Sequence, residues 1–345
     1  MSEKNHVTLK DVARAAGVSP STVSRVLSGK IPVDPKTERR IRDEIEKLGY
    51  VPNYLAKSLK EGSGHTIGLI VPDITNPVFP AVALGAETEA VRNGYQLFLA
   101  HSHEDEKKEA VLAQLLIQHG AAGLLVATAC RGSSFPEECK KKPVCQVVRL
   151  QTADVPSVTA DQVMVGKLAA GRFLSIGCRH PAILAGDRSL ALHRDRLAGF
   201  VQTMKNSGVN DIQIIDSSDP DEDGRFVTEQ LLTTKGLEID SIFAASDMQA
   251  LGVVRTLWLH HIPVPEKIAV IGVDNLGIST LCTPPITCIR QPLQEIGRLA
   301  CSRLISFIER QRTQKTPEEA VFENSFGSEH RHLVLPCELV MGETA

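Results

Sequence analysis

Residues 8–27 read TLKDVARAAGVSPSTVSRVL, and this stretch carries the signals that begin and end two short helices. Thr8 and Asp11 form a capping box in which Asp11 takes the place of the usual Glu or Gln. Gly17 then ends the first helix, because glycine adopts the left-handed conformation of a helix C-terminus without steric cost. The stretch therefore predicts a short capped helix followed by a tight turn.

The same kinds of signal recur in the residues that follow. Ser19 is placed to cap a second helix, with Pro20 at its first position, where a missing N–H is harmless. This helix extends to about Leu27. Asp34 begins a third helix, which ends at Gly49. The first fifty residues are therefore predicted to form three short helices.

The second helix has two contrasting faces. The apolar side chains that can pack on the other two helices are Val23, Val26 and Leu27. The outward side chains are short and polar around one long cation, and they are Ser21, Thr22, Arg25 and Ser28. Such a face suits the major groove of DNA, where small residues let the backbone approach and Arg25 reaches base edges, guanine best. A plain three-helix bundle with a solvated face would show the same pattern, so this alternative stays open.

Charge is distributed unevenly along the chain. Residues 1–60 contain 12 Lys and Arg against 7 Asp and Glu, a net charge of +5, whereas the rest of the chain carries a net charge of −8. A basic head on an acidic body indicates that the head meets a polyanion.

Residues 52–60 show a short helical pattern that Asn53 can cap and that Gly62-Ser63-Gly64 follows. A helix of two turns is unstable alone in water, because nucleating a helix is costly. The segment is therefore either a solvated linker or a helix that folds only when something orders it.

From Thr66 onward, apolar strands alternate with helices. The expected strands are 67–71, 96–100, 123–127, 144–150, 182–185, 212–215, 241–245 and 268–273, and the expected helices are 79–92, 107–119, 163–176, 194–207, 226–234, 248–260 and 293–310. Continuous apolar strands between helices are typical of parallel sheets covered on both faces. Two such runs predict two doubly wound lobes with a ligand at the carboxyl ends of the strands.

Polar residues gather just after several of these strands. They are Asp73 and Asn76, then Asp161, Asp187 and Arg188, Ser246 and Asp247, and Asp274 and Asn275. Carboxylates, amides and arginines around a cleft can hold a polyhydroxylated or heteroaromatic ligand by paired hydrogen bonds. Asp and Asn are also ordinary helix caps; we expect Asp247 to be a cap and Asp274 to contact the ligand.

Motifs along nearly the whole chain resemble those of the lactose/galactose repressor (LacI/GalR) family of transcription regulators. In the head they are residues 8–13, 16–19, 21–27 and 48–53, and further on they are residues 73–77, 161–162, 196–200, 246–252 and 270–275. The resemblance implies an α-helical helix-turn-helix headpiece in residues 1–52 and a hinge helix with its linker in 53–64. It also implies a two-lobed α/β sensor domain in 65–345, like type I periplasmic binding proteins. The lobes would be about 66–161 with 291–320, and 162–290 with 321–340.

The resemblance also implies which residues meet DNA. The recognition helix would carry Thr22, Ser24 and Arg25, and Pro20 and Ser21 match positions that choose the operator. Thr8, Tyr50 and Asn53 match positions near the phosphate backbone, where contacts position a protein without reading sequence. In the hinge, Leu59 would be wedged into the minor groove, which Ala56, Lys57 and Lys60 would line.

For the effector, the resemblance implies that Arg196 and Asp274 make the main polar contacts. The rest of the pocket would be lined by Asp73, Asn76, Phe79, Asp161 and Ser246. The chain departs from the family in having Val78 and Phe79 where two aromatics are usual, and an acidic run at 218–223 where an aromatic is often found. We expect the only tryptophan, Trp258, in the core. The family's leucine-rich tetramer tail is missing, which favours a homodimer.

The sequence thus predicts a repressor that binds a near-palindromic operator and responds to a sugar or related metabolite. A binding protein with no DNA role is the first alternative, and an enzyme is the second, although G-x-S-x-G, P-loop, G-x-G-x-x-G and H-E-x-x-H motifs are missing. We expect no cofactor and no metal site, because the eight cysteines form no CxxC pair and suggest reduced thiols. The polar N-terminus and the lack of a long apolar run predict a soluble, cytoplasmic protein.

Overall fold

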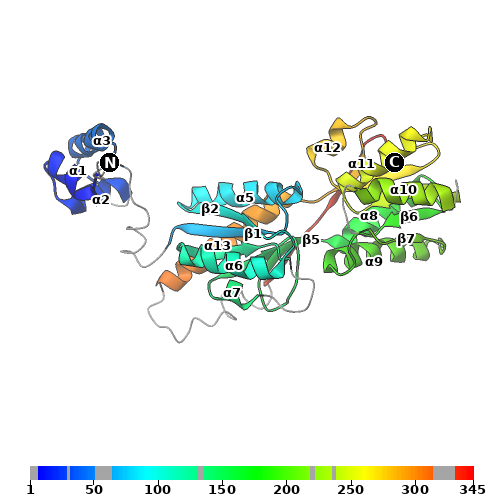
Figure 1. Cartoon of the computed structure of the whole chain (residues 1–345), viewed down its shortest axis with the longest axis horizontal. Coiled ribbons are helices and arrows are strands. Elements are labelled where there is room, and N and C mark those ends of the chain that lie inside the picture. Colours follow the sequence, from blue (N-terminus) through cyan, green and yellow to red (C-terminus); the bar gives the residue numbers. More distant parts are fainter. Residues whose placement is uncertain are drawn as a thin grey trace, which may run out of the picture. The chain divides into compact units, whose positions relative to one another are not determined.

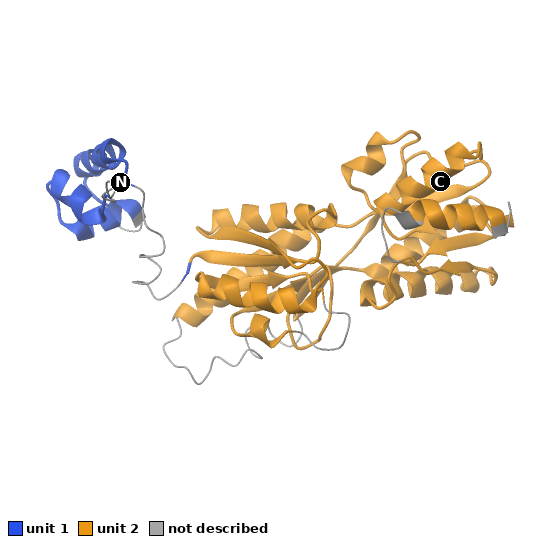
Figure 2. Cartoon of the chain, viewed as in Figure 1, with its two compact units in different colours: residues 1–64 blue, residues 65–345 orange. Residues whose placement is uncertain are grey.

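The computed structural model describes residues 7–28, 32–50, 64–129, 136–217, 222–234, 238–313 and 331–345. Figure 2 shows the chain divided into two compact units, residues 1–64 and 65–345. The predicted hinge contacts Asn53, Ala56, Lys57, Leu59 and Lys60 lie outside the described residues.

The first unit contains the three predicted helices: α1 (Leu9–Ala15), α2 (Pro20–Ser28) and α3 (Pro35–Leu48). Asp11 accepts hydrogen bonds from the backbone N–H of Thr8 at 2.9 Å and from its hydroxyl at 2.6 Å, and Ser19 Oγ accepts from Thr22 N at 3.2 Å. Gly17 and Gly49 both have left-handed backbones. The helix signals read from the sequence are therefore confirmed.

The core of this unit is small and aliphatic. Its buried members are Val12, Ala13, Ala16, Val23, Val26 and Ile41. Leu27 differs from the prediction, because 36% of it is exposed. It lies next to the last residue of α2 and is not part of the core cluster.

The second unit is built on two six-stranded sheets, one in each lobe. The first has the order β11-β5-β4-β3-β1-β2 and comprises β1 (Thr66–Val71), β2 (Gln96–His101), β3 (Ala121–Val126), β4 (Val144–Val147), β5 (Ser157–Ala160) and β11 (His332–Leu335). The second has the order β12-β10-β9-β8-β6-β7 and comprises β6 (Pro181–Leu184), β7 (Gln213–Ile215), β8 (Ser241–Ala244), β9 (Ala269–Asp274), β10 (Thr287–Arg290) and β12 (Glu338–Val340). All described pairings are parallel except that of β10 with β12, so the two doubly wound lobes are confirmed.

Helices cover both faces of each sheet (Figure 1). In the first lobe they are α5 (Val78–Arg92), α6 (Glu106–Gln118), α7 (Glu137–Lys140) and α13 (Leu293–Thr313). In the second they are α8 (Gln162–Ser175), α9 (Ala191–Asn206), α10 (Glu222–Thr234), α11 (Asp247–Leu259) and α12 (Gly277–Leu281). Strand side chains alternate between the faces: Leu69 belongs to the cluster beneath α5, and Ile70 to the cluster beneath α6. None of the described helices is both long and apolar enough to cross a membrane.

The C-terminal segment divides between the lobes differently from the prediction. We expected residues 321–340 in the second lobe, but β11 pairs in parallel with β5 in the first lobe. Only β12 joins the second sheet, antiparallel to β10. The chain thus crosses between the lobes a third time after β11. Two short, half-exposed edge strands carry too little periodicity to reveal this crossing from sequence.

Helices α8 and α9 cross at backbone contact. A Cβ atom added to Gly166 would lie 2.1 Å from the carbonyl oxygen of Arg196, and one added to Gly199 would lie 2.1 Å from that of Val163. Glycine therefore allows α9 to approach α8 this closely, and the crossing holds the backbone of Arg196 against the start of α8.

Gly166→Ala should lower the free energy of unfolding by about 1–3 kcal/mol or more, because the added methyl group would force the helices apart. Gly171→Ala is the matched control on the same helix: its position is exposed, with nothing within 4 Å of an added Cβ, so about 0.5–1 kcal/mol of stabilisation is expected. Urea unfolding of the full chain would measure both. Equal effects of the two variants would show that the crossing is not tight.

Candidate functional site

A cavity of about 480 Å³ lies between the two lobes of the second unit, at the carboxyl ends of the strands. The first lobe contributes Asp73, Asn76, Phe79, Glu104 and Arg149, among others. The second contributes Asp187, His193, Arg196, Ser246 and Asp274, among others, and Gln162 and Gln291 lie beside the crossovers between the lobes. Its position agrees with the rule that doubly wound sheets bind ligands beyond the carboxyl ends of their strands.

Six of the seven predicted effector residues line this cavity: Asp73, Asn76, Phe79, Arg196, Ser246 and Asp274. Asp161 is not among the lining residues. Its carboxylate caps α8 by accepting a hydrogen bond from Met164 N at 2.8 Å. The next residue, Gln162, lines the cavity instead.

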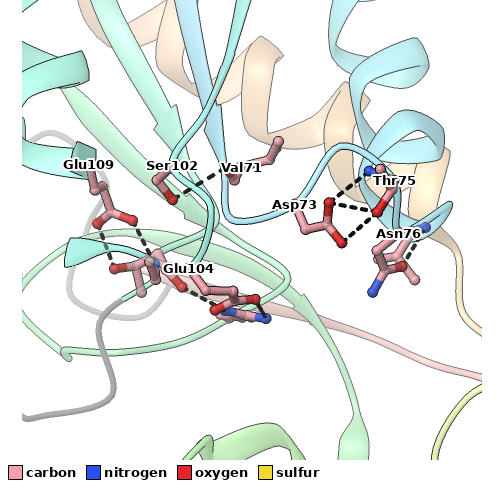
Figure 3. A network of polar contacts seen from close by, with 11 residues as sticks. Val71, Asp73, Thr75, Asn76, Ser102, Glu104 and Glu109 are labelled. Carbon is pink, nitrogen blue, oxygen red and sulfur yellow. Dashed lines mark hydrogen bonds and ion pairs between the residues drawn. The ribbon is translucent and has the colours of Figure 1, made fainter. Parts of the chain in front are cut away.

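The loop after β1 is ordered by its own side chains, as Figure 3 shows. Asp73 Oδ1 accepts from both the backbone N–H and the hydroxyl of Thr75 at 2.8 Å. Asn76 Oδ1 accepts from Val78 N at 3.1 Å. These local bonds hold Asp73 and Asn76 in place without any ligand.

Arg196 is 3% exposed and its donors are paired within the second lobe. Its Nε and Nη2 atoms donate to Gln162 Oε1 at 3.2 and 2.6 Å, and Nη1 donates to the carbonyl oxygen of Ala245. Gln162 Nε2 then donates to Gln291 Oε1 at 2.7 Å, and Gln291 Nε2 donates to Asp274 Oδ1 at 2.5 Å. A continuous chain of side chains therefore joins the guanidinium to the carboxylate.

Burial and charge act in opposite directions on this pair. Burial raises the pKa of Asp274, while the nearby Arg196 guanidinium lowers it. Burial likewise lowers the pKa of Arg196, and the Asp274 carboxylate opposes that shift. Each ionised group thus favours the charged form of the other in a site shielded from water.

Several lining residues have left-handed backbones that only glycine adopts easily. The φ angles of Glu104, Val148 and Asp274 are 56°, 64° and 103°. Val148 is the most unusual, because β-branched residues are rarely found there. Such residues cost of order 1–3 kcal/mol each and cluster at ligand sites, where the fold holds them in place.

His193 lines the cavity beside Gly186, and a Cβ atom added to that glycine would lie 2.1 Å from His193 Nδ1. Burial, together with the charges of Arg196 and Arg149, lowers the pKa of His193 to about 3. The imidazole is therefore neutral at physiological pH.

In the first unit, the predicted reading face of α2 is solvent-accessible. Pro20, Ser21, Ser24 and Arg25 are exposed and Thr22 is half-buried. Ser19 Oγ is hydrogen-bonded to Ser21 Oγ at 2.7 Å and to Thr22 Oγ1 at 2.9 Å, so these hydroxyls form one cluster at the start of the helix. Thr8 is exposed, and Tyr50 is half-buried against the core.

Comparison with known protein families agrees with both units. A model described as "Bacterial regulatory proteins, lacI family" matches residues 8–53. A second, described as "Periplasmic binding proteins and sugar binding domain of LacI family", matches residues 64–340. The chain belongs to the LacI family. Its members are transcription regulators, so the regulatory class predicted from the sequence is confirmed at the level of the family.

Individual relatives cover most of the LacI-family chain. The ribose operon repressor of Bacillus subtilis is 35% identical over 90% of this chain and 94% of its own length. That of Escherichia coli is 32% identical over 90% of this chain and 97% of its own. The structure of a lac repressor dimer bound to operator has a TM-score of 0.82 with 23% identity, covering 98% of each chain, which shows the shared fold. A CelR–cellobiose complex has a TM-score of 0.69 with 25% identity, covering 98% of this chain and all of its own.

Sequence reasoning missed several lining residues of this LacI-family cavity. Arg149 was hidden inside a predicted strand that extended to residue 150, whereas β4 ends at Val147. Gln291 follows β10, a strand that we did not predict. Glu104 stands three residues beyond β2, in a loop whose backbone brings it back to the cavity. More accurate strand ends would have revealed the first two.

Asp247 is not the helix cap that we expected. Ser246 caps α11 by accepting from Gln249 N at 3.2 Å, while Asp247 is 1% exposed. The Asp247 carboxyl group accepts from Leu276 N at 2.7 Å and from the Cys288 thiol at 2.9 Å. The bond to Leu276 N therefore anchors the left-handed segment at 274–275 on the side away from the cavity. Burial raises the pKa of Asp247 from 3.8 to about 7.

The stability of the chain should depend on pH through Asp247. Because its pKa is raised on folding, the native state keeps a proton that the unfolded chain releases, and the free energy of unfolding falls as pH rises from about 4 to 7. The side chain of Asp247→Asn cannot ionise, so its free energy of unfolding should not fall in this way. Relative to the wild type, the variant's free energy of unfolding should increase by roughly 2 kcal/mol as the pH rises from 5 to 7. Urea unfolding across this range would measure the gain. The exposed Asp211→Asn on the same lobe is the control, and parallel pH profiles for Asp247→Asn and the wild type would disprove the assignment.

Proposed function

We propose that the chain is a repressor that binds a near-palindromic operator as a homodimer and responds to a sugar or related metabolite in the cavity between its lobes. The observation that carries the proposal is that one LacI-family chain combines an exposed polar α2 face with a preorganised polar cavity in a separate unit. The relatives named as ribose operon repressors make D-ribose the first effector to test.

On DNA, the exposed face of α2 would enter the major groove. Arg25 would reach a base edge, with guanine O6 and N7 as its best partners. The hydroxyl cluster of Ser21 and Thr22 would lie close to the groove, and Thr8 and Tyr50 would meet phosphates. A dimer places two such helices about one helical turn of DNA apart, which is why the operator should be near-palindromic.

Exposed apolar side chains support the homodimer. In the first lobe six of them lie on the edge strand β2 and on the neighbouring helices α5 and α6, namely Leu84, Val91, Phe98, Leu99, Val111 and Leu115, and Leu150 and Val334 are exposed elsewhere on it. In the second lobe four of them lie on α10, α11 and α12, namely Phe226, Trp258, Leu259 and Leu281, and Ile176, Ile214 and Met341 are exposed elsewhere on it. Trp258 is 71% exposed, so our expectation that it belongs to the core was wrong. Apolar surface of this extent on both lobes suits an interface with a second copy.

The effector would act through the lobes. A ligand that binds one arrangement of the lobes better than another shifts the population toward it, and operator affinity changes only by that difference. Arg196 and Asp274 would make its principal hydrogen bonds, because both are buried and held in place before binding. The hinge segments of the two subunits would carry the change to the headpieces.

Selection of bound genomic fragments by the purified full chain tests this function directly. We expect enrichment of a near-palindromic sequence, and a change in its affinity when D-ribose or another member of a sugar panel is added. Binding no tighter to any fragment than to random DNA would refute the proposal.

Arg25→Ala should reduce discrimination between operator and mismatched DNA by about 1–3 kcal/mol, because a bidentate base contact is lost. The matched control is Arg42→Ala on α3, where Arg42 pairs with Glu38 at 2.7 Å. Fluorescence anisotropy with operator and scrambled duplexes would measure both variants. Undiminished selectivity in Arg25→Ala would remove that residue from the reading face.

Asp274→Ala should abolish the effect of the effector on operator binding while leaving ligand-free operator affinity close to the wild type. Losing a hydrogen bond between a ligand hydroxyl and a charged group costs about 1.5–3 kcal/mol of ligand affinity. Isothermal titration and gel shifts with the effector found in the panel would measure the loss. Asp211→Ala, exposed on the same lobe, should respond normally. A normal response in Asp274→Ala would contradict its assignment.

A further inference from the structure

One wall of the cavity carries an ion pair that the family-based expectations did not include. Arg149 Nη1 lies 3.0 Å from Glu104 Oε2, and Arg149 Nη2 lies 2.8 Å from Glu104 Oε1, so the two groups form a bidentate pair. Arg149 Nη1 also donates to the carbonyl oxygen of Thr128 at 3.1 Å, and the guanidinium lies 5.7 Å from the centre of the Phe79 ring. Glu104 therefore occupies the Nη1–Nη2 edge of Arg149, one of the two edges on which a guanidinium binds a carboxylate or phosphate in bidentate fashion.

A second layer of contacts holds this pair in place (Figure 3). Glu109 is fully buried and accepts from Thr128 Oγ1 at 2.7 Å and from Ala129 N at 2.5 Å. This fixes the segment whose carbonyl oxygen accepts from Arg149. On the other side, Glu104 has a left-handed backbone, and its N–H donates to the carbonyl oxygen of Pro72 at 3.0 Å. Both Arg149 and Glu104 are thus held in place by contacts outside the ion pair itself.

The net charge of the cavity also disfavours an anionic ligand. The described lining residues include four carboxylates and two guanidiniums: Asp73, Glu104, Asp187, Asp274, Arg149 and Arg196. His193 adds no positive charge, since its pKa is about 3. An anionic ligand would meet this negative excess after losing its water, whereas ligand hydroxyl groups can donate to the carboxylates and accept from Arg196.

We propose that the Glu104–Arg149 pair is an anion filter that makes the site select uncharged, polyhydroxylated ligands over their phosphate esters or acids. The proposal rests on the ligand-binding role proposed above and identifies the ligand's charge class. Glu104 takes the place of a ligand anion beside Arg149 and neutralises its guanidinium. Arg149 in turn packs on Phe79 and donates to the carbonyl oxygen of Thr128. Glu104 is therefore a specificity-determining residue of the site.

The filter predicts that removing the Glu104 charge will create an anion site. In Glu104→Gln the guanidinium of Arg149 is no longer neutralised, and inorganic phosphate should bind on the order of tenfold more tightly than to the wild type, as expected for a charge-assisted contact. Isothermal titration of the full chain with phosphate at constant ionic strength would measure this gain. The double variant Glu104→Gln/Arg149→Gln should return to the wild-type level.

Two comparisons isolate the cavity from the basic head. Every variant keeps the same residues 1–64, so phosphate bound there contributes equally and cancels. Glu338→Gln releases Arg290 from a 2.9 Å ion pair at the edge of the second sheet, outside the cavity lining. It should show no gain, because a single surface arginine without converging partners makes a weak anion site. Circular dichroism checks folding, and Glu104→Ala serves as a second variant if Glu104→Gln does not fold.

Phosphate binding to the wild type that depends on Arg149 would overturn the proposal, because it would mean that Glu104 yields to an anion. An absence of gain in folded Glu104→Gln and Glu104→Ala would overturn it as well. Neither result would bear on operator selection, which is measured without any ligand, so failure of the filter and failure of the repressor function are distinguishable.

Discussion

A guanidinium removed from water must have its N–H groups paired and its charge balanced, and for Arg196 two segments accept its hydrogen bonds while a third supplies the opposing charge. Gln162 comes from the start of α8, the carbonyl oxygen from the end of β8, and the opposing charge from Asp274 at the end of β9. The glycine-lined crossing of α8 and α9 sets the backbone of Arg196 at the distance that these bonds require. The second-lobe wall of the cavity is therefore organised around one buried cation.

The same bonds connect the site to the places where the chain passes between lobes. Gln162 begins α8 just after the crossover from β5, and Gln291 lies in the crossover from β10 to α13; Gln162 Nε2 donates to Gln291 Oε1 at 2.7 Å. Each also bonds a residue proposed to contact the effector, so both crossovers and the proposed effector contacts belong to one chain of hydrogen bonds.

The two walls of the cavity differ in how their charged side chains are paired. On the second lobe, Arg196 and Asp274 remain inside the cavity, connected by amides that a ligand's hydroxyl groups can join. On the first lobe, Arg149 and Glu104 neutralise each other directly and are held by Glu109 and Thr128 behind them. One wall is arranged to form new hydrogen bonds, and the other is already closed to anions. Strained backbones at Glu104, Val148 and Asp274 show that the fold holds both walls before any ligand arrives.

The sequence by itself determined the elements whose signals are local. Helix caps, the glycine stops and the alternation of apolar strands with helices depend on neighbours a few residues away, and they predicted the three-helix head, the two parallel lobes and most residues at the strand ends. Motif resemblance added Arg196 and agreed with Asp274, which its position after a strand had already indicated. The tertiary structure alone decided what depends on distant partners: β11 joins the first sheet, Asp161 serves as a cap, Trp258 is exposed, and Asp247 supports the segment behind Asp274. It also brought Glu104 and Arg149 together from loops 45 residues apart. Such contacts depend on chain crossings and on the alignment of strand ends, which no periodicity within one segment can encode.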